Sequence, residues 1–128
     1  MAKLDAINSS LIEALKKVFS PKKYIVYPCD FFKTITVESV KRDSDININI
    51  NISCVMNKVI ADFTNVQMTE SKPRNKLLYQ AIDMIYSLDA ITDVAISCEL
   101  TDTLAEFCAG NNFVKAKSFD GYIRRKTN

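Results

Sequence analysis

Hydrophobic residues recur at helical spacing in two long stretches of the chain, residues 4–19 and 72–88. The first stripe consists of Leu4, Ile7, Leu11, Ala14, Leu15 and Val18, and the second of Leu77, Leu78, Ala81, Ile82, Ile85 and Leu88. Both patterns predict amphipathic helices. Ser20-Pro21 should end the first, while Ser71 can cap the second and Pro73 suits its first turn. A shorter helix is expected over 102–110, capped by Thr101 or Asp102.

Elsewhere the pattern has a period of two residues, which is typical of strands. Strands are predicted at 22–28, 31–40, 46–53, 57–69 and 92–100, with the turn KRDSD between the second and third. In the second, Thr34, Thr36 and Glu38 should form a solvent-facing side. The last part, FVKAKSF and YIRRK, flanks Asp120-Gly121 and predicts a closing hairpin with a two-residue turn.

The stretch DINININIS, residues 45–53, alternates most strictly. Its isoleucines should face a core, and Asn47, Asn49 and Asn51 should lie on the opposite side of the strand. Two interpretations remain open for that side. It is a solvated face, or it is a docking surface, because amides both donate and accept hydrogen bonds. In either case the strand should be paired on both edges or covered, since a free edge of this kind is prone to aggregation.

The side-chain parity of the next strand changes part of the way along it. Val59, Ala61 and Phe63 occupy odd positions, whereas Val66 and Met68 occupy even ones. One extra residue within 63–66 would keep all five on the same side. A β-bulge is therefore predicted there.

Composition excludes several classes of site. The 128 residues, 48% apolar, suit a single domain spanning 1–128, and a net charge of +2 provides no strong attraction to polyanions. There is no histidine and no CxxC pair, so zinc sites and histidine triads are not expected. Cys29, Cys54, Cys98 and Cys108 are expected as reduced core residues.

No signal peptide or bilayer-spanning run is recognisable, so a cytoplasmic location is expected. The heavy use of Ile, Asn and Lys is typical of A+T-rich coding sequences, as in many phages and some bacteria. If the chain is encoded by a phage, its expected location is the host cytoplasm or the virion.

The order helix, four strands, helix, strand, helix, two strands resembles the GNAT acetyltransferase superfamily. LAEFCAGNNFVKAKSFDGYIRRK is similar to that family's short helix and closing hairpin, with Phe107 and Phe113 at its two aromatic positions. The resemblance implies an α/β (α+β) fold with a central, mostly antiparallel mixed sheet, a bulged strand and flanking helices. It also implies acetyl-coenzyme A, held near Val66, Met68, Arg74, Asn75 and Lys76, with Asp62 and Cys108 at the places of the catalytic base and acid.

The chain departs from the family where the chemistry occurs. The phosphate loop lacks glycine, since the corresponding segment is SKPRNKLL, and Pro73 removes one N–H donor. Cys108 replaces a tyrosine and is a poor proton donor, whereas Asn112, in place of a glycine, tolerates the left-handed backbone.

These departures favour a catalytically inactive GNAT-like domain without a cofactor, acting as a protein-binding or self-assembling subunit such as a phage accessory or virion protein. Its contact surfaces would be Asn47, Asn49, Asn51, Arg124 and Arg125. One alternative is an active N-acetyltransferase with an atypical phosphate loop. Another is a protein that contacts nucleic acid through Lys115, Lys117, Arg124, Arg125 and Lys126 of the last hairpin. No membrane partner is expected.

Overall fold

A computed structural model describes residues 2–19, 23–28, 34–40, 46–68, 72–98, 101–117 and 119–126, with side chains from residue 5 in the first helix and from residue 75 in the second. The elements in chain order are α1 (Ala2–Val18), β1 (Tyr24–Pro28), β2 (Thr34–Ser39), β3 (Ile46–Val55), β4 (Lys58–Met68), α2 (Lys72–Tyr86), β5 (Asp93–Ile96), α3 (Asp102–Gly110), β6 (Val114–Lys115) and β7 (Tyr122–Arg125). The predicted turn at 41–45, the helix end at Ser20-Pro21 and the Ser71 cap lie outside the described residues.

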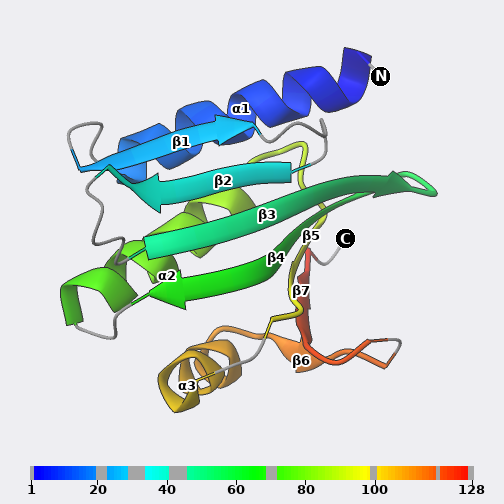
Figure 1. Cartoon of the computed structure of the whole chain (residues 1–128). Helices are drawn as coiled ribbons and strands as arrows, with labels where there is room; N and C mark the ends of the chain where they lie inside the picture. Colours follow the sequence, from blue (N-terminus) through cyan, green and yellow to red (C-terminus); the bar gives the residue numbers. More distant parts are fainter. Residues whose placement is uncertain are drawn as a thin grey trace.

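Over the described residues the fold is α+β, with one mixed sheet of seven strands and three helices (Figure 1). The strand order is β1-β2-β3-β4-β5-β7-β6, and β4 and β5 are the one parallel pair among these strands. β3 is paired on both sides, with β2 and β4, as its composition requires. α1 and α2 contact each other and lie on the same face of the sheet.

The core lies between that face and the two helices. Ile46, Ile48, Ile50 and Ile52 of β3 are all at most 1% exposed and pack in one cluster with the apolar stripes of α1 and α2. Buried side chains of this size each contribute about 1.5–3 kcal/mol to the transfer free energy, so the alternating pattern supplies a large part of the driving force for folding.

The predicted bulge is present and lies at Thr64. Asn49 pairs with Asn65 and Ile50 with Phe63, so Thr64 has no partner of its own across the ladder. The Thr64 hydroxyl donates to the Asn49 carbonyl, 3.4 Å away. Because of this extra residue, Phe63 before the bulge and Val66 after it both contact the core.

Two short-range features at helix ends also agree with expectation. The Thr101 side chain accepts a hydrogen bond from the Leu104 N–H and caps α3. After α3, Asn112 has φ of 65°, the left-handed conformation that asparagine tolerates.

Several boundaries differ from prediction. α2 ends at Tyr86, so Leu88 lies in the following turn, and β5 spans only Asp93–Ile96 of the expected 92–100.

Two side chains differ from prediction in their burial. Thr36 is buried (5% exposed), although its face of β2 was expected to contact solvent. The neighbouring strands pair with β2 on both sides and cover this short side chain. Cys54 is exposed at the end of the β3–β4 hairpin, contrary to its expected core position; Cys29 lies outside the described residues.

The predicted two-residue turn at Asp120-Gly121 is wrong. Lys115 pairs with Tyr122, and the Ala116 N–H donates to the Gly121 carbonyl at 2.9 Å, so residues 116–121 form the connection. Gly121 is instead required by a close approach, because a Cβ there would clash with the Ile96 carbonyl oxygen and lie 2.9 Å from Ser97 Cα. The two-residue turn occurs between β3 and β4, where Met56 and Asn57 both have positive φ.

Candidate functional site

The parallel strands β4 and β5 separate at their carboxyl ends. They pair from Ile60 and Asp93 to Phe63 and Ile96, and the Ser97 N–H still donates to the Phe63 carbonyl at 3.2 Å. β4 then bulges at Thr64 and continues to Met68 with no described partner on that side. Carboxyl ends of parallel strands are common ligand sites because side chains and helix starts converge there.

A small pocket lies at this separation, between β4 and the first turns of α2 and α3. Its lining consists of Val66, Met68, Asn75, Leu78, Tyr79, Thr101 and Leu104. Its volume is about 40 Å³, enough for a water molecule or two. The structure thus brings together three of the five residues proposed for the cofactor, Val66, Met68 and Asn75. Lys76 is exposed outside this lining, and the Arg74 side chain is not among those described.

Two aromatic rings hold α2 and α3 together beside the pocket. Tyr79 and Phe107 stack with their ring centres 4.1 Å apart and their planes nearly parallel. The Tyr79 hydroxyl also donates to the Thr103 carbonyl at 3.3 Å. The sequence indicated Phe107 through the family resemblance but gave no signal for Tyr79, whose partner lies 28 residues further along the chain. Tyr79, which lines the pocket, is thus fixed to α3 by the ring stack and by its hydroxyl.

Asp62 lies on the sheet face that points away from α1 and α2, because its neighbours Ala61 and Phe63 point into the core. Both carboxylate oxygens accept from the Ser97 hydroxyl, at 2.8 and 3.0 Å. Burial raises the pKa of Asp62 above its usual value, and the hydrogen bonds from Ser97 partly offset this. Asp62 is therefore a half-buried carboxylate held by its neighbour, outside the lining of the pocket.

Cys108 is fully buried in α3 and also lies outside the pocket lining. Burial, with a smaller contribution from Cys98, raises the pKa of the Cys108 thiol to about 11. The pKa of Cys98 is raised as well, first by burial and then by the nearby Asp62 carboxylate. Both thiols consequently stay protonated at neutral pH, which makes them weak nucleophiles and poor acids.

The second candidate region is the sheet face opposite the helices, which we call the amide face. Its central part is formed on β2 by Thr34 and Thr36, which pair with Asn51 and Asn49 of β3, and along β3 also by Asn47 and Ser53. The Thr36 hydroxyl donates to Asn49 Oδ1 at 3.2 Å. Asn51 is exposed, while Asn47 and Asn49 are half-buried. In Figure 1 no helix is drawn over this face of the described strands.

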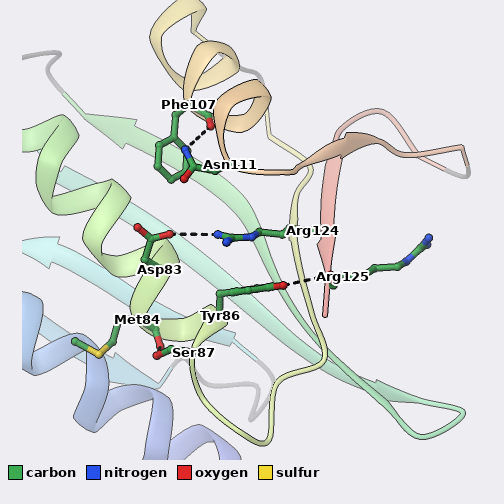
Figure 2. Close-up of polar contacts among 8 residues, drawn as sticks. All are labelled: Asp83, Met84, Tyr86, Ser87, Phe107, Asn111, Arg124 and Arg125. Carbon is green, nitrogen blue, oxygen red and sulfur yellow. Dashed lines mark hydrogen bonds and ion pairs between the residues drawn. The ribbon is translucent and has the colours of Figure 1, made fainter. Parts of the chain in front are cut away.

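The two arginines proposed as a surface lie on opposite faces of β7. Arg124 lies 3.9 Å from the centre of the Tyr86 ring and 3.3 Å from Asp83 Oδ1, with its side chain 18% exposed (Figure 2). Arg125 pairs with Asp93, 3.3 Å away, and its carbonyl accepts from the Tyr86 hydroxyl. The Lys126 ammonium donates to the Leu88 carbonyl. These three cations attach β7 to α2 and β5 rather than forming one open patch.

Comparison with known proteins gives no match to any protein-family model and no match to a curated protein. Within the described ranges, no helix is long and apolar enough to cross a bilayer. The same residues contain no cluster of three Cys, Asp or Glu side chains arranged to hold a metal ion.

Proposed function

We propose that this chain is a GNAT-like domain that has no acetyltransferase activity and works by binding protein through the amide face. One observation carries the proposal. The pocket at the separation of β4 and β5 holds about 40 Å³, and both residues at the catalytic places, Asp62 and Cys108, lie outside its lining. The amide face, on the other side of the sheet, offers a wider polar surface among the described residues.

Support for a GNAT-like arrangement comes from the region after the bulge. A bulged strand leads into a helix, the next strand is parallel to it and separates from it, and a short helix is followed by a closing hairpin. Asn112 in the left-handed conformation keeps the path of the chain where the family has glycine.

Weak cofactor binding follows from the start of α2. No glycine occurs from Thr69 to Leu78, and Pro73 lacks an N–H donor. Each charge-assisted hydrogen bond lost to a pyrophosphate forgoes about 1.5–3 kcal/mol. Two such losses weaken affinity by at least about a hundredfold. Lysine and arginine side chains recover only part of this, because ordering them costs conformational entropy.

The alternative, an N-acetyltransferase with an atypical phosphate loop, is favoured by one observation. Val66, Met68 and Asn75 meet in a single pocket at the carboxyl end of the parallel strand pair. That is the arrangement expected if a ligand enters between the strands.

Calorimetric titration of the purified chain with acetyl-coenzyme A separates the two functions. Our proposal expects no saturable binding at micromolar ligand. Micromolar binding that Asn75→Leu abolishes and Lys16→Ala on α1 does not, together with acetyl transfer lost in Asp62→Asn, would establish the enzyme instead.

A further inference from the structure

The amide face has chemically opposite ends. The register aligns Ile25 on β1 with Glu38 on β2 and Asn47 on β3 at one end of the face. At the other end it aligns Val55 on β3 with Lys58 on β4. Directly paired residues of antiparallel strands point to the same side, so all five belong to this face. At these five described positions, each end therefore carries one apolar side chain and one charge, and the charges have opposite sign; residues 41–45, which join β2 to β3 beside Glu38, lie outside the described residues.

Both apolar side chains are unusually exposed for residues of their type. Ile25 is 44% exposed and Val55 is 55% exposed. Lys58 is exposed as well, and Glu38 is half-buried. Neither charge forms an ion pair with another residue of the described strands and helices. The two ends are thus available to complement one another in a second molecule.

We propose that the partner of the amide face is a second copy of this chain, bound face to face about a two-fold axis at Asn51. This inference rests on the proposed binding function and names its partner. The axis runs between the two stacked faces and is perpendicular to the line that joins Glu38 to Lys58. It brings each Glu38 opposite Lys58 of the other copy. Such an interface is self-complementary, as two-fold symmetry requires.

The dimensions of the sheet agree with this arrangement. Asn47 and Val55 are separated by about 27 Å at the usual rise per residue, and β2 and β4 by about 10 Å. Exchanging Glu38 and Lys58 then makes the strands of the two sheets cross at about 40°, close to the roughly 30° at which stacked sheets pack. The same operation places Ile25 within about 3 Å of the position above Val55 of the other copy.

At the centre of the contact, Asn51, which is exposed, lies midway between the two ends and faces Asn51 of the other molecule across the axis. Its ladder partner Asp62 on β4 lies beside it on the same face, with its carboxylate held by Ser97, so the axis also brings the two Asp62 side chains toward each other. An amide group donates and accepts, so two asparagines can bond each other in this position. The four strands give a contact of only about 500 Å² on each copy, below the standard of about 800 Å². A contact of this size is typical of weak, reversible association.

Sedimentation equilibrium of the purified full chain, from about 1 to 300 μM, tests the proposal. Glu38→Lys and Lys58→Glu should each weaken the dimer at least about tenfold, since each places like charges together twice. An equimolar mixture of these two variants should regain the affinity, because both contacts then pair opposite charges. Glu13→Lys and Lys16→Glu, at exposed positions of α1, make the same charge changes and should leave the dimer unaltered.

A chain that remains monomeric at 300 μM would overturn the second-copy assignment, as would a dimer insensitive to Glu38→Lys, or variants that fail to recover on mixing. None of these results bears on the titration with acetyl-coenzyme A, which judges the proposed function separately. Far-ultraviolet circular dichroism of each variant establishes that a loss of affinity is not a loss of fold.

Discussion

The Arg124 guanidinium lies over the ring of Tyr86, 3.9 Å from its centre, and so connects β7 to α2. Asp83 on the same helix accepts from Arg124 at 3.3 Å. Figure 2 shows the three side chains converging from the two elements. A planar guanidinium can lie flat on the ring while it donates from its edge in a fixed fork geometry, which a compact ammonium does not reproduce.

Replacing Arg124 with lysine should therefore destabilise the protein although charge is retained. We expect the free energy of unfolding to fall by about 1–2 kcal/mol, measured by urea denaturation. Arg125→Lys is the matched control, because that side chain is 60% exposed and lysine still supplies a cation beside Asp93. Equal effects of the two substitutions would contradict a specific role for the Arg124–Tyr86 contact.

Gly121→Ala should loosen the pairing of β7 with β5. Its Cβ would meet the Ile96 carbonyl oxygen and Ser97 Cα, which are backbone atoms that cannot move independently. We expect a loss of about 1–3 kcal/mol in thermal or urea unfolding. Gly110→Ala is the control, since a Cβ at that helical position meets nothing within 4 Å and alanine favours the helix by up to about 1 kcal/mol.

Deleting Thr64 should be tolerated, because Thr64 is the extra residue of the bulge. With Thr64 removed, Asn65 follows Phe63 directly and Val66 still faces the core. A loss of about 1 kcal/mol is expected from the hydroxyl bond to Asn49. Deleting Ile60 from the regular part of β4 should instead cost more than about 3 kcal/mol, since Val59 and Phe63 can then no longer share one face. If the two deletions lowered the free energy of unfolding by similar amounts, the bulge would not be what places Phe63 and Val66 on the same face of β4.

Asp62→Asn tests the carboxylate beside Ser97 through its pH dependence. Burial raises the pKa of Asp62 in the folded chain above its unfolded value of about 3.8, so ionisation of Asp62 opposes folding. Its contribution to stability is greatest below pH 3.8 and falls as pH rises through the folded pKa. We compare the free energy of unfolding of the asparagine variant with that of the parent, by urea titration at pH 3 and at pH 7. The variant should gain stability relative to the parent as the pH rises from 3 to 7. A relative loss at pH 7 would reverse the assigned direction.

The sequence by itself determined the features that depend on near neighbours along the chain. The isoleucine alternation required β3 to be a strand with one buried face, and the parity change at Thr64 required a bulge. A cap at Thr101 or Asp102 followed from side chains that can accept from the first N–H groups of a helix. These features depend on positions only a few residues apart, so spacing along the chain was sufficient, whereas the left-handed Asn112 was expected from the family resemblance.

Only the tertiary structure decided where distant residues meet. Asp120-Gly121 had the local preference for a tight turn, yet Gly121 is needed because β5 passes against it. Arg124 seemed a surface cation until α2, whose Asp83 is 41 positions earlier, was placed beside it. Asp62 accepts from the Ser97 hydroxyl, 35 positions later, a contact that neither segment indicates by itself. Packing between elements fixes these contacts, and no pattern within either partner segment encodes the distance between them.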